Sequence, residues 1–437
     1  MKKIIRFTLL SLLVLMYQLS FGQMMIMQGQ WKGRIIKDNK EWNTELNFYL
    51  SEHELKGDFN LPDYGLYHLV FSIVQIKDSI VHFEYIDKNS KAIFKGILND
   101  RNISGDWEGL GINATFSIKK LSNTSVQFNT EEVSFINADA KLSGTLILPI
   151  GKGPFPAIIQ VHGSGNQTRG EDFYKSRAYL FARNGIAVLI YDRRGKGAST
   201  GTNVSMELLA DDAIAGVHFL QQHASIQKNK IGIMGFSQGG YVGPLAASRS
   251  DDIVFIIAGS APGITPDEQN DFDVEHQLIS RKVSEDSIAY VLNFRKDLRN
   301  YQYNNSGDKN ELDGRLSEIR SKSWYENTLL PDSVMGPVSA GVKDWLTFNP
   351  LPIWKKIKIP KLLIWGELDD AVPAAKSKEL IEGVFKESGN KNYLLKVYKN
   401  ASHGIELIND GKEWDWPRLA EGYHQTLVDW VKNITSK

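Results

Sequence analysis

The sequence predicts an α/β domain that follows a small all-β module and carries a helical insertion. From about residue 126 onward, continuous apolar runs alternate with amphipathic segments of helix length. Strands buried on both faces of a mostly parallel sheet require such runs. Before residue 126, short alternating runs are separated by Asp, Asn, Gly and Ser, as is typical of antiparallel strands. Between about residues 263 and 350 the sequence is polar and helical in texture, which breaks the alternation.

The first 22 residues are predicted to be a secretory signal peptide. "MKKIIRF" supplies a basic start, "TLLSLLVLMYQL" a short apolar stretch and "SFGQ" a small-residue exit. The alternative is an uncleaved membrane anchor, although the apolar run is short for a membrane span. The chain contains no cysteine, so a lipoprotein anchor is excluded. We therefore expect export, to the periplasm or outside the cell, and no membrane span in the mature chain.

Composition excludes several classes of function. The 51 basic residues balance the 51 acidic ones, so no electrostatic footprint indicates nucleic-acid binding. The absence of cysteine rules out a disulfide scaffold, a thiolate zinc site and a cysteine nucleophile. There is no His-Glu-x-x-His motif and no loop with calcium-binding or phosphate-binding spacing. We expect neither a metal nor a cofactor.

The module of residues 24–125 is expected to be a small antiparallel sandwich or open barrel. Its clearest strand-like runs lie at 30–35, 44–50, 79–86 and 91–98. Two segments, "LKGDFN" at Leu55–Asn60 and "ISGDWEG" at Ile103–Gly109, both place Gly-Asp-aromatic at a strand edge. No constellation of catalytic residues is present here. The module could be structural support, a lid or a recognition element.

The α/β domain of residues 126–437 has a clear order of elements. Two strands around an Asn-Ala-Asp turn are expected at 131–149, and buried strands at 155–163, 185–192, 230–235, 252–260, 360–367 and 393–400. Helices are expected at 173–184, 206–222, 238–249, 374–386 and 418–432. The insertion of residues 263–350 is then a helical cap over the active face, since long insertions at such places are usually functional.

Ser237 is the candidate nucleophile. In "GFSQGG" it follows the strand 231–235 at a sharp turn into a helix, and the neighbouring glycines relieve crowding there. A short Gly-x-Ser-x-Gly pattern also arises by chance, so the interpretation depends on partners elsewhere. A serine hydroxyl is a weak nucleophile until a base accepts its proton.

The partners are expected at the ends of the last two strands, because chemistry collects at the carboxyl edge of a parallel sheet. His403, in "KNASHGIE", is the best base among nine histidines. The acid that orients it comes from "GELDDAVP", which offers Glu367, Asp369 and Asp370. Spacing favours Asp369. Asp370 is the alternative, and either carboxylate could instead cap the following helix.

The backbone N–H groups of Ser164 and Gln238 are the predicted oxyanion donors. Ser164 lies in "QVHGSGNQ", the turn after the first long core strand, and Gln238 follows the nucleophile. His162 precedes this turn and is expected to buttress it.

These residues together resemble the α/β-hydrolase fold over residues 126–437. The matching pieces are "VHGSG", "YDRRGKGAS", "GFSQGG", "GELDDAVP" and "SHG". The resemblance implies that Asp192, Arg194 and Gly195 form an ion-paired, glycine-shaped loop without a catalytic role. With its signal peptide and β module, the whole chain resembles the bacterial EstD-like carboxylesterases, related to the dienelactone-hydrolase and serine-aminopeptidase-like branches.

That resemblance implies a serine esterase that cleaves small-molecule esters, often with short acyl chains, through an acyl-enzyme and without a cofactor. One alternative is an exopeptidase of the same fold, in which cap acids would grip a peptide terminus. Those acids are Asp267, Glu268, Asp271, Asp273 and Glu275. An alternative of another class is a non-catalytic binding protein on a hydrolase scaffold. The acyl and alcohol groups of the substrate and the oligomeric state stay open at this point.

Overall fold

A computed structural model describes residues 24–436 except 52–53, 88–89, 110, 123–127, 166, 203 and 409–418. The expected signal peptide, residues 1–22, lies outside the described residues. The chain divides into two compact units. The first comprises Met1–Asn129, Glu171–Arg183 and Asn409–Leu419, and the second comprises Thr130–Gly170, Asn184–Ile408 and Ala420–Lys437. Each unit is described separately below.

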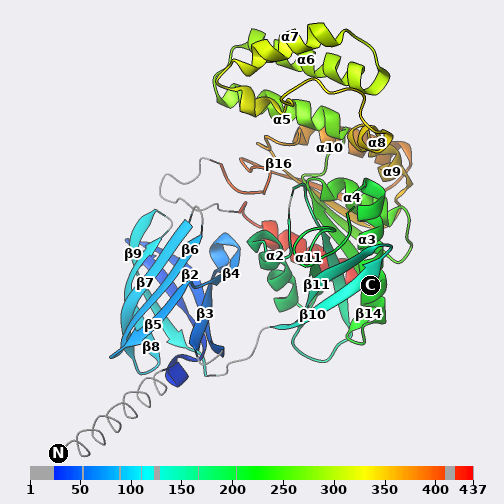
Figure 1. The fold of residues 1–437 in the computed structure, drawn as a ribbon. Helices are drawn as coiled ribbons and strands as arrows, with labels where there is room; N and C mark the ends of the chain where they lie inside the picture. Colours follow the sequence, from blue (N-terminus) through cyan, green and yellow to red (C-terminus); the bar gives the residue numbers. More distant parts are fainter. Residues whose placement is uncertain are drawn as a thin grey trace, which may run out of the picture. The chain divides into compact units, whose positions relative to one another are not determined.

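The first unit is an antiparallel β-barrel (Figure 1). Its described strands form one nine-stranded sheet in the order β4-β3-β2-β1-β9-β8-β7-β6-β5. The strands are β1 (Gly29–Lys37), β2 (Lys40–Ser51), β3 (Glu54–Leu61), β4 (Leu66–Val70), β5 (Ile73–Lys77), β6 (Ile80–Asp87), β7 (Ser90–Asn99), β8 (Asn102–Gly109) and β9 (Ile112–Lys120). A short 3₁₀ turn, η1 (Pro62–Tyr64), separates β3 from β4. The predicted all-β module is confirmed, as a barrel of one sheet.

Two consecutive residues join the two edges of this sheet. Phe71 N–H donates to the carbonyl of Gly57 on β3 over 2.9 Å, and Ser72 N–H donates to the carbonyl of Glu84 on β6 over 2.7 Å. The barrel interior is filled by buried aromatic side chains that include Trp31, Phe48, Phe59, Phe83, Phe94, Trp107 and Phe116. The alternating sequence pattern therefore buries one face of each strand in a packed core.

Helix α2 (Asp172–Arg183) belongs to the same unit although the chain reaches it from the second one. Ser176 Oγ donates to the carbonyl of Gly65 over 3.1 Å, and Arg183 Nη2 lies 2.7 Å from Glu45 Oε2 on β2. The helix thus covers part of the outer face of the barrel beside β4.

The second unit is built on an eight-stranded sheet of order β10-β11-β13-β12-β14-β15-β16-β17. Its strands are β10 (Phe128–Asn137), β11 (Ala140–Pro149), β12 (Phe155–Val161), β13 (Ala187–Tyr191), β14 (Ile226–Phe236), β15 (Phe255–Gly259), β16 (Lys361–Gly366) and β17 (Tyr393–Tyr398). β11 pairs antiparallel with β13, whereas the pairs from β13 through β17 are parallel. The predicted α/β fold is confirmed.

Helices cover both faces of this sheet, which explains the continuous apolar runs. α3 (Met206–Gln222), α4 (Gly239–Ala247), α9 (Leu351–Lys356) and α10 (Ala374–Glu387) contribute to one core cluster that includes Ile256 and Ala258 of β15. The ring of Phe255, which precedes Ile256 on β15, instead contacts the ring of Trp430 on α11 (Tyr423–Thr435), with 5.9 Å between the centroids. Successive strand residues point to opposite faces, so α11 covers the other side.

The insertion predicted at 263–350 is helical and has an apolar core of its own. It contains α5 (Pro266–Ser280), α6 (Glu285–Asn304), α7 (Lys309–Arg320), η2 (Tyr325–Thr328) and α8 (Ala340–Leu346). Figure 1 shows α5, α6 and α7 side by side. Buried residues from these three helices form a separate cluster, among them Val274, Phe294 and Leu316.

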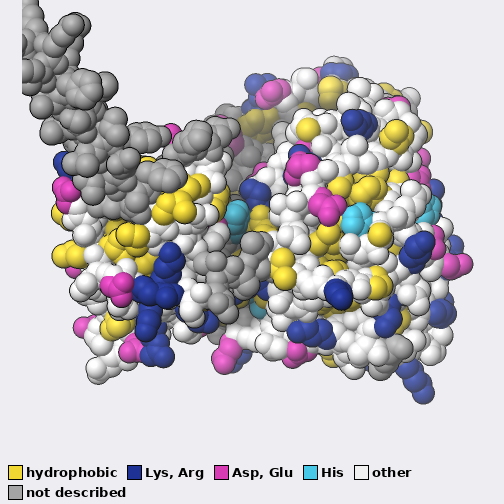
Figure 2. Space-filling model, turned by 90° about the horizontal axis from the view of Figure 1, so that it is seen from below, with side chains coloured by type: hydrophobic (Ala, Val, Ile, Leu, Met, Phe, Trp, Pro, Cys, Tyr) yellow, Lys and Arg dark blue, Asp and Glu magenta, His cyan; other side chains and the backbone are white. Residues whose placement is uncertain are grey.

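The described surface carries charges of both signs. On the face drawn in Figure 2, basic and acidic side chains are both spread over the surface, with hydrophobic side chains between them. Within the described ranges, no helix is both long and apolar enough to cross a membrane.

Candidate active site

Ser237 lies at the tip of a strained turn between β14 and α4. Its φ is 56°, a left-handed conformation that costs free energy for a residue with a side chain. The turn is tight: a Cβ added to Gly235 would lie 2.3 Å from the carbonyl oxygen of Gly239, and one on Gly240 would lie 2.7 Å from Cα of Ala261. Only glycine fits at either position. This geometry holds the serine hydroxyl clear of the sheet.

Asp369 and His403 meet at the carboxyl ends of β16 and β17. His403 Nδ1 lies 2.9 Å from both Asp369 Oδ1 and Asp369 Oδ2. The N–H groups of Ala371 and Val372 donate to Asp369 Oδ1 over 3.0 and 2.8 Å, so the carboxylate is fixed by its own loop. The Asp369 side chain is 0% exposed, whereas that of His403 is 30% exposed.

The acid that contacts His403 is Asp369 and not its neighbours. Glu367 accepts a hydrogen bond from Asn400 N–H over 3.0 Å, and Asp370 is exposed. Burial lowers the pKa of His403, but the hydrogen bond and charge of Asp369, with smaller contributions from Asp370 and Asp273, outweigh it and raise the pKa above its usual value. The pair is therefore suited to stabilise an imidazolium.

The end of β15 connects the serine turn to the histidine loop. Ser237 N–H donates to the carbonyl of Gly259 over 3.0 Å. The next residue, Ser260, is buried, and its Oγ donates to the carbonyl of His403 over 2.8 Å. Ser237 and His403, which are both described, form no direct hydrogen bond. Catalytic hydrogen bonds are often long in ligand-free enzymes and tighten when substrate binds.

The loop after β12 lies beside the serine turn, and both predicted oxyanion amides have no partner. A Cβ added to Gly163 would lie 3.5 Å from the carbonyl oxygen of Phe236, which precedes Ser237. Among the described residues, nothing accepts a hydrogen bond from the N–H of Ser164 or of Gln238. An oxyanion needs N–H groups that no other acceptor occupies.

His162, at the start of this loop, is anchored to the neighbouring strand β13. It is buried, and its Nε2 lies 2.5 Å from the carbonyl oxygen of Tyr191. Burial lowers its pKa to about 4, although the bond to Tyr191 opposes this shift. The imidazole is therefore neutral at physiological pH.

The side chains of the two arginines in "YDRRG" bind different parts of the structure. Arg193 is buried and its Nη1 donates to the carbonyls of Gly163 and Gly165 over 3.2 and 3.1 Å, which fixes the oxyanion loop. Arg194 turns away and binds Asp212 through two hydrogen bonds of 3.0 and 2.6 Å, with both side chains 0% exposed.

The same turn is shaped by Asp192 and glycines. Asp192 accepts hydrogen bonds from the N–H groups of Arg169 and Ala198 over 3.0 and 2.9 Å. Gly195 and Gly197 both have positive φ. The loop is glycine-shaped and ion-paired as the resemblance implies, but Asp192 pairs with Arg169 at 3.9 Å, whereas Arg194 pairs with Asp212.

Sequence reasoning missed Arg193, Ser260 and Gln167, whose Oε1 accepts from Gly163 N–H over 2.9 Å. These side chains bind backbone groups, so no motif of reactive residues marks them. The only sequence signal for Arg193 was the pair of adjacent arginines. Adjacent side chains in an extended segment point to opposite sides, so the two arginines were expected to bind different partners.

This sheet order and the chain order of its functional residues define an α/β-hydrolase. The antiparallel strand β11 lies beside parallel strands, and the serine turn, the acid and the histidine follow β14, β16 and β17 in turn. The chain belongs to the family described as X-Pro dipeptidyl-peptidase (S15 family), whose model matches residues 139–376, more than half of the sequence. The matched range contains Ser237 and Asp369 and ends before His403. The superfamily indicated by the sequence motifs is thereby confirmed.

Similarity extends to named esterases and thiohydrolases. The chain is 28% identical to esterase EstD of Thermotoga maritima over 294 residues, which are 64% of this chain and 62% of EstD. It is 32% identical over 157 residues to thiohydrolase aneE of Aspergillus aculeatus, or 35% of this chain and 48% of that protein. The chain thus spans less than two thirds of the length of either relative. The solved structure of the Pyrococcus furiosus esterase Pf2001 matches 71% of this chain and 91% of its own, with 20% identity and a TM-score of 0.45.

Proposed function

We propose that the chain is a serine hydrolase that cleaves carboxylic esters, with preference for short acyl groups. The observation that carries this proposal is the buried Asp369 carboxylate bound to His403 at the sheet edge where the Ser237 turn lies. The two unpartnered amides of Ser164 and Gln238 beside that turn support it. The similarity to EstD supports the choice of ester as substrate.

The reaction proceeds in two steps. His403 accepts the Ser237 proton as Oγ attacks the ester carbonyl, and Asp369 stabilises the resulting imidazolium. The N–H groups of Ser164 and Gln238 bind the oxyanion of the tetrahedral intermediate. His403 then gives the proton to the leaving alcohol, an acyl-enzyme remains on Ser237, and water activated by His403 releases the acid.

Contacts in the cap favour esters over peptides. An exopeptidase needs free acids to hold an amino terminus, but four of the five cap acids named above have partners within the cap, the fourth being Asp273, which accepts from Gln277 Nε2 over 2.9 Å. Tyr303 donates to Asp267 over 2.8 Å, Arg295 binds Asp271 over 2.7 Å, and Glu268 closes the capping box at the start of α5. The name of the matching family keeps an X-Pro dipeptide as the second candidate substrate.

One preparation separates these functions. Turnover of a nitrophenyl ester series from acetate to decanoate is compared with turnover of a glycyl-prolyl arylamide. We expect the highest kcat/KM for the short esters, and a Ser237→Ala loss of roughly 10⁴-fold or more in kcat. Faster turnover of the arylamide would replace the ester with the dipeptide. Failure of a fluorophosphonate to label Ser237 would instead favour a non-catalytic binding protein.

We also propose that the chain is exported, on the basis of the basic and apolar composition of residues 1–22. Expression of the full sequence in a bacterium with a periplasm should yield a product that begins near residue 23, as intact-mass measurement would show. A product that keeps Met1 and stays with the membrane would instead support the anchor.

A further inference from the structure

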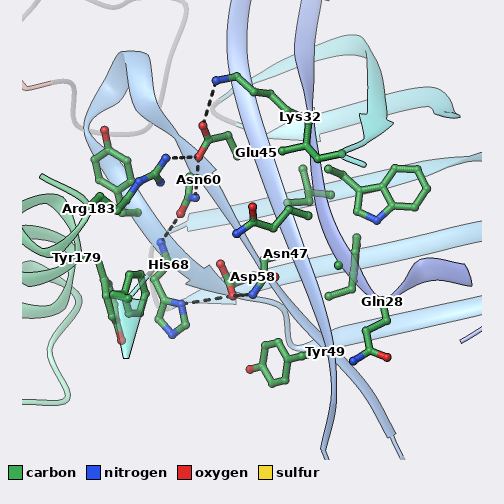
Figure 3. Close-up of a pocket in the computed structure, with 18 of the residues that line it drawn as sticks. Gln28, Lys32, Glu45, Asn47, Tyr49, Asp58, Asn60, His68, Tyr179 and Arg183 are labelled. Atoms are coloured by element: carbon green, nitrogen blue, oxygen red, sulfur yellow. Dashed lines mark hydrogen bonds and ion pairs between the residues drawn. The ribbon is translucent and has the colours of Figure 1, made fainter. Parts of the chain in front are cut away.

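A pocket lies on the outer face of the barrel, within the first unit. It has a volume of about 720 Å³ and is lined by side chains from β1 to β4 and by Tyr179 and Arg183 of α2 (Figure 3). This volume is in the range of small-molecule sites. The barrel interior is filled by aromatic rings, so a ligand of this unit would bind here on its outside.

The sequence contains two Gly-Asp-aromatic segments, and only one of them lines this pocket. In Gly57–Phe59 and Gly105–Trp107 alike, the aromatic ring is buried in the barrel core. Asp106 is exposed on β8 and pairs in register with Lys95. Asp58 is only 5% exposed and lines the pocket. Burial of a carboxylate is costly unless it is paired and hydrogen-bonded, and the motif itself does not require it.

Asp58 is incompletely satisfied by its neighbours. Asn47 Nδ2 lies 3.3 Å and His68 Nδ1 3.4 Å from its Oδ2, which is longer than charge-assisted hydrogen bonds usually are. Among the described residues, no side chain donates to Oδ1. His68 is held there in a strained backbone conformation with φ 59°, and Asn60 Oδ1 accepts from its N–H over 2.7 Å. The structure thus maintains a buried acceptor that faces the pocket.

The fixed charges of the pocket cancel. Glu45 lies 3.3 Å from Lys32 Nζ and 2.7 Å from Arg183 Nη2. Burial raises the pKa of Glu45, but Arg183 and Lys32 outweigh this and hold it below its usual value. With Asp58, the lining therefore contains two carboxylates and two permanent cations. A neutral ligand suits this balance better than an ion does.

Several other described polar groups that line the pocket have no hydrogen-bond partner, and they include both donors and acceptors. Figure 3 shows Gln28, Tyr49 and Asp58 around one end of the pocket. In the described part of the chain, the side chains of Gln28 and Tyr49 have no hydrogen-bond partner, nor does Oδ1 of Asn47. Burial and the charge of Asp58 raise the pKa of Tyr49, so that its hydroxyl stays protonated and available as a donor.

We propose that this pocket binds a neutral saccharide unit, whose hydroxyls donate to Asp58 and Asn47 and accept from Tyr49 and Gln28. A sugar presents alternating donors and acceptors without net charge, which matches the open donors and acceptors of this pocket. The site lies within the first unit and does not depend on the proposed catalysis.

The test is isothermal titration calorimetry on the full chain that carries Ser237→Ala, so that hydrolysis cannot contribute. Glucose, galactose, xylose, mannose, cellobiose and xylobiose are the neutral probes. Glucosamine and glucuronate are charged analogues of glucose. We expect at least one neutral probe to bind with a Kd of about 1 mM or tighter. Asp58→Asn should weaken it roughly 10-fold or more, because the amide oxygen stays with Asn47 and His68 and an NH₂ donor replaces the acceptor that faces the ligand. Tyr49→Phe should weaken it about 5-fold, because it removes a hydrogen bond to the ligand.

Asp106→Asn is the matched control, since it changes the exposed copy of the same motif and should leave the Kd unchanged. The unfolding midpoint of each variant is measured as well. If Asp58→Asn does not fold, Tyr49→Phe still decides the question, because it deletes one oxygen from a half-buried side chain. The proposal is overturned if no neutral probe binds, if Tyr49→Phe and Asp58→Asn leave binding unchanged, or if only glucosamine or glucuronate binds.

Discussion

Replacing Asp369 by Asn tests the proposed acid–base pair most directly. Ala371 and Val372 donate their N–H groups to Asp369 Oδ1, so an asparagine at this position keeps its carbonyl oxygen there. Its NH₂ group then faces Nδ1 of His403, where the carboxylate oxygen was. Because Nδ1 lies 2.9 Å from both oxygens, this NH₂ group competes with the ring N–H, and the tautomer in which Nδ1 accepts carries its proton on Nε2. His403 then cannot take the proton of Ser237.

The magnitude follows from the contact. At 2.9 Å between Nδ1 and the carboxylate oxygens, an effective dielectric constant of 20 gives an attraction of about 6 kcal/mol for the imidazolium. The loss of that attraction in the transition state corresponds to roughly 10⁴-fold in kcat. Asp370→Asn is the matched control. Asp370 is exposed and does not touch His403, so we expect a change of about twofold or less.

The assay is steady-state hydrolysis of a nitrophenyl acetate over pH 5 to 9. Asp369 and Asp370 both raise the pKa of His403, and the reaction needs the neutral ring. The acidic limb of kcat/KM should therefore lie above pH 6.5 in the wild type, and it should move to lower pH in Asp370→Asn. Retention of more than a tenth of kcat in Asp369→Asn, or an equal loss in Asp370→Asn, would refute the reasoning.

Three further predictions concern groups around the site. Asp212→Ala should destabilise the chain by about 3–5 kcal/mol in urea unfolding, because it leaves the buried Arg194 guanidinium without its main partner; the double variant Arg194→Met/Asp212→Leu should be more stable than that single one. Ser260→Ala should lower kcat about 5- to 10-fold with little change in KM, since it removes one hydrogen bond that positions His403; an unchanged kcat would contradict this role. The pKa of His162 is about 4 in the folded state, whereas it is ~6.5 in the unfolded chain. The free energy of unfolding should therefore fall as the pH drops from ~6.5 to about 4, by up to about 3 kcal/mol. Urea titrations should show a smaller fall in His162→Asn.

Much of the second unit could be predicted because its signals are local. A strand buried on both faces needs an unbroken apolar run, and each such run ends where a loop residue enters the site. Ser237, Asp369 and His403 were therefore identifiable from position and chemistry together. Ser260 and Arg193 were not, because each acts on a backbone carbonyl far away in sequence, and no residue pattern records such a contact.

The barrel shows a different limit. Alternation indicates antiparallel strands, but it does not say which strands pair or whether the sheet closes. Closure depends on two hydrogen bonds that the backbone N–H groups of Phe71 and Ser72 donate. Any residue except proline can donate such a hydrogen bond. The difference between Asp58 and Asp106 is equally invisible, since their neighbours in sequence are alike and only the tertiary surroundings distinguish them.

Helix α2 has a consequence for how this chain can be divided. It lies between β12 and β13 in sequence, but its partners Gly65 and Glu45 belong to the barrel. A fragment that starts at residue 130 would keep the helix and lose what covers it, leaving the buried ring of Tyr179 facing water. The first unit is therefore assembled from segments that the second unit separates in sequence, so a boundary drawn at a single residue cannot divide the two units.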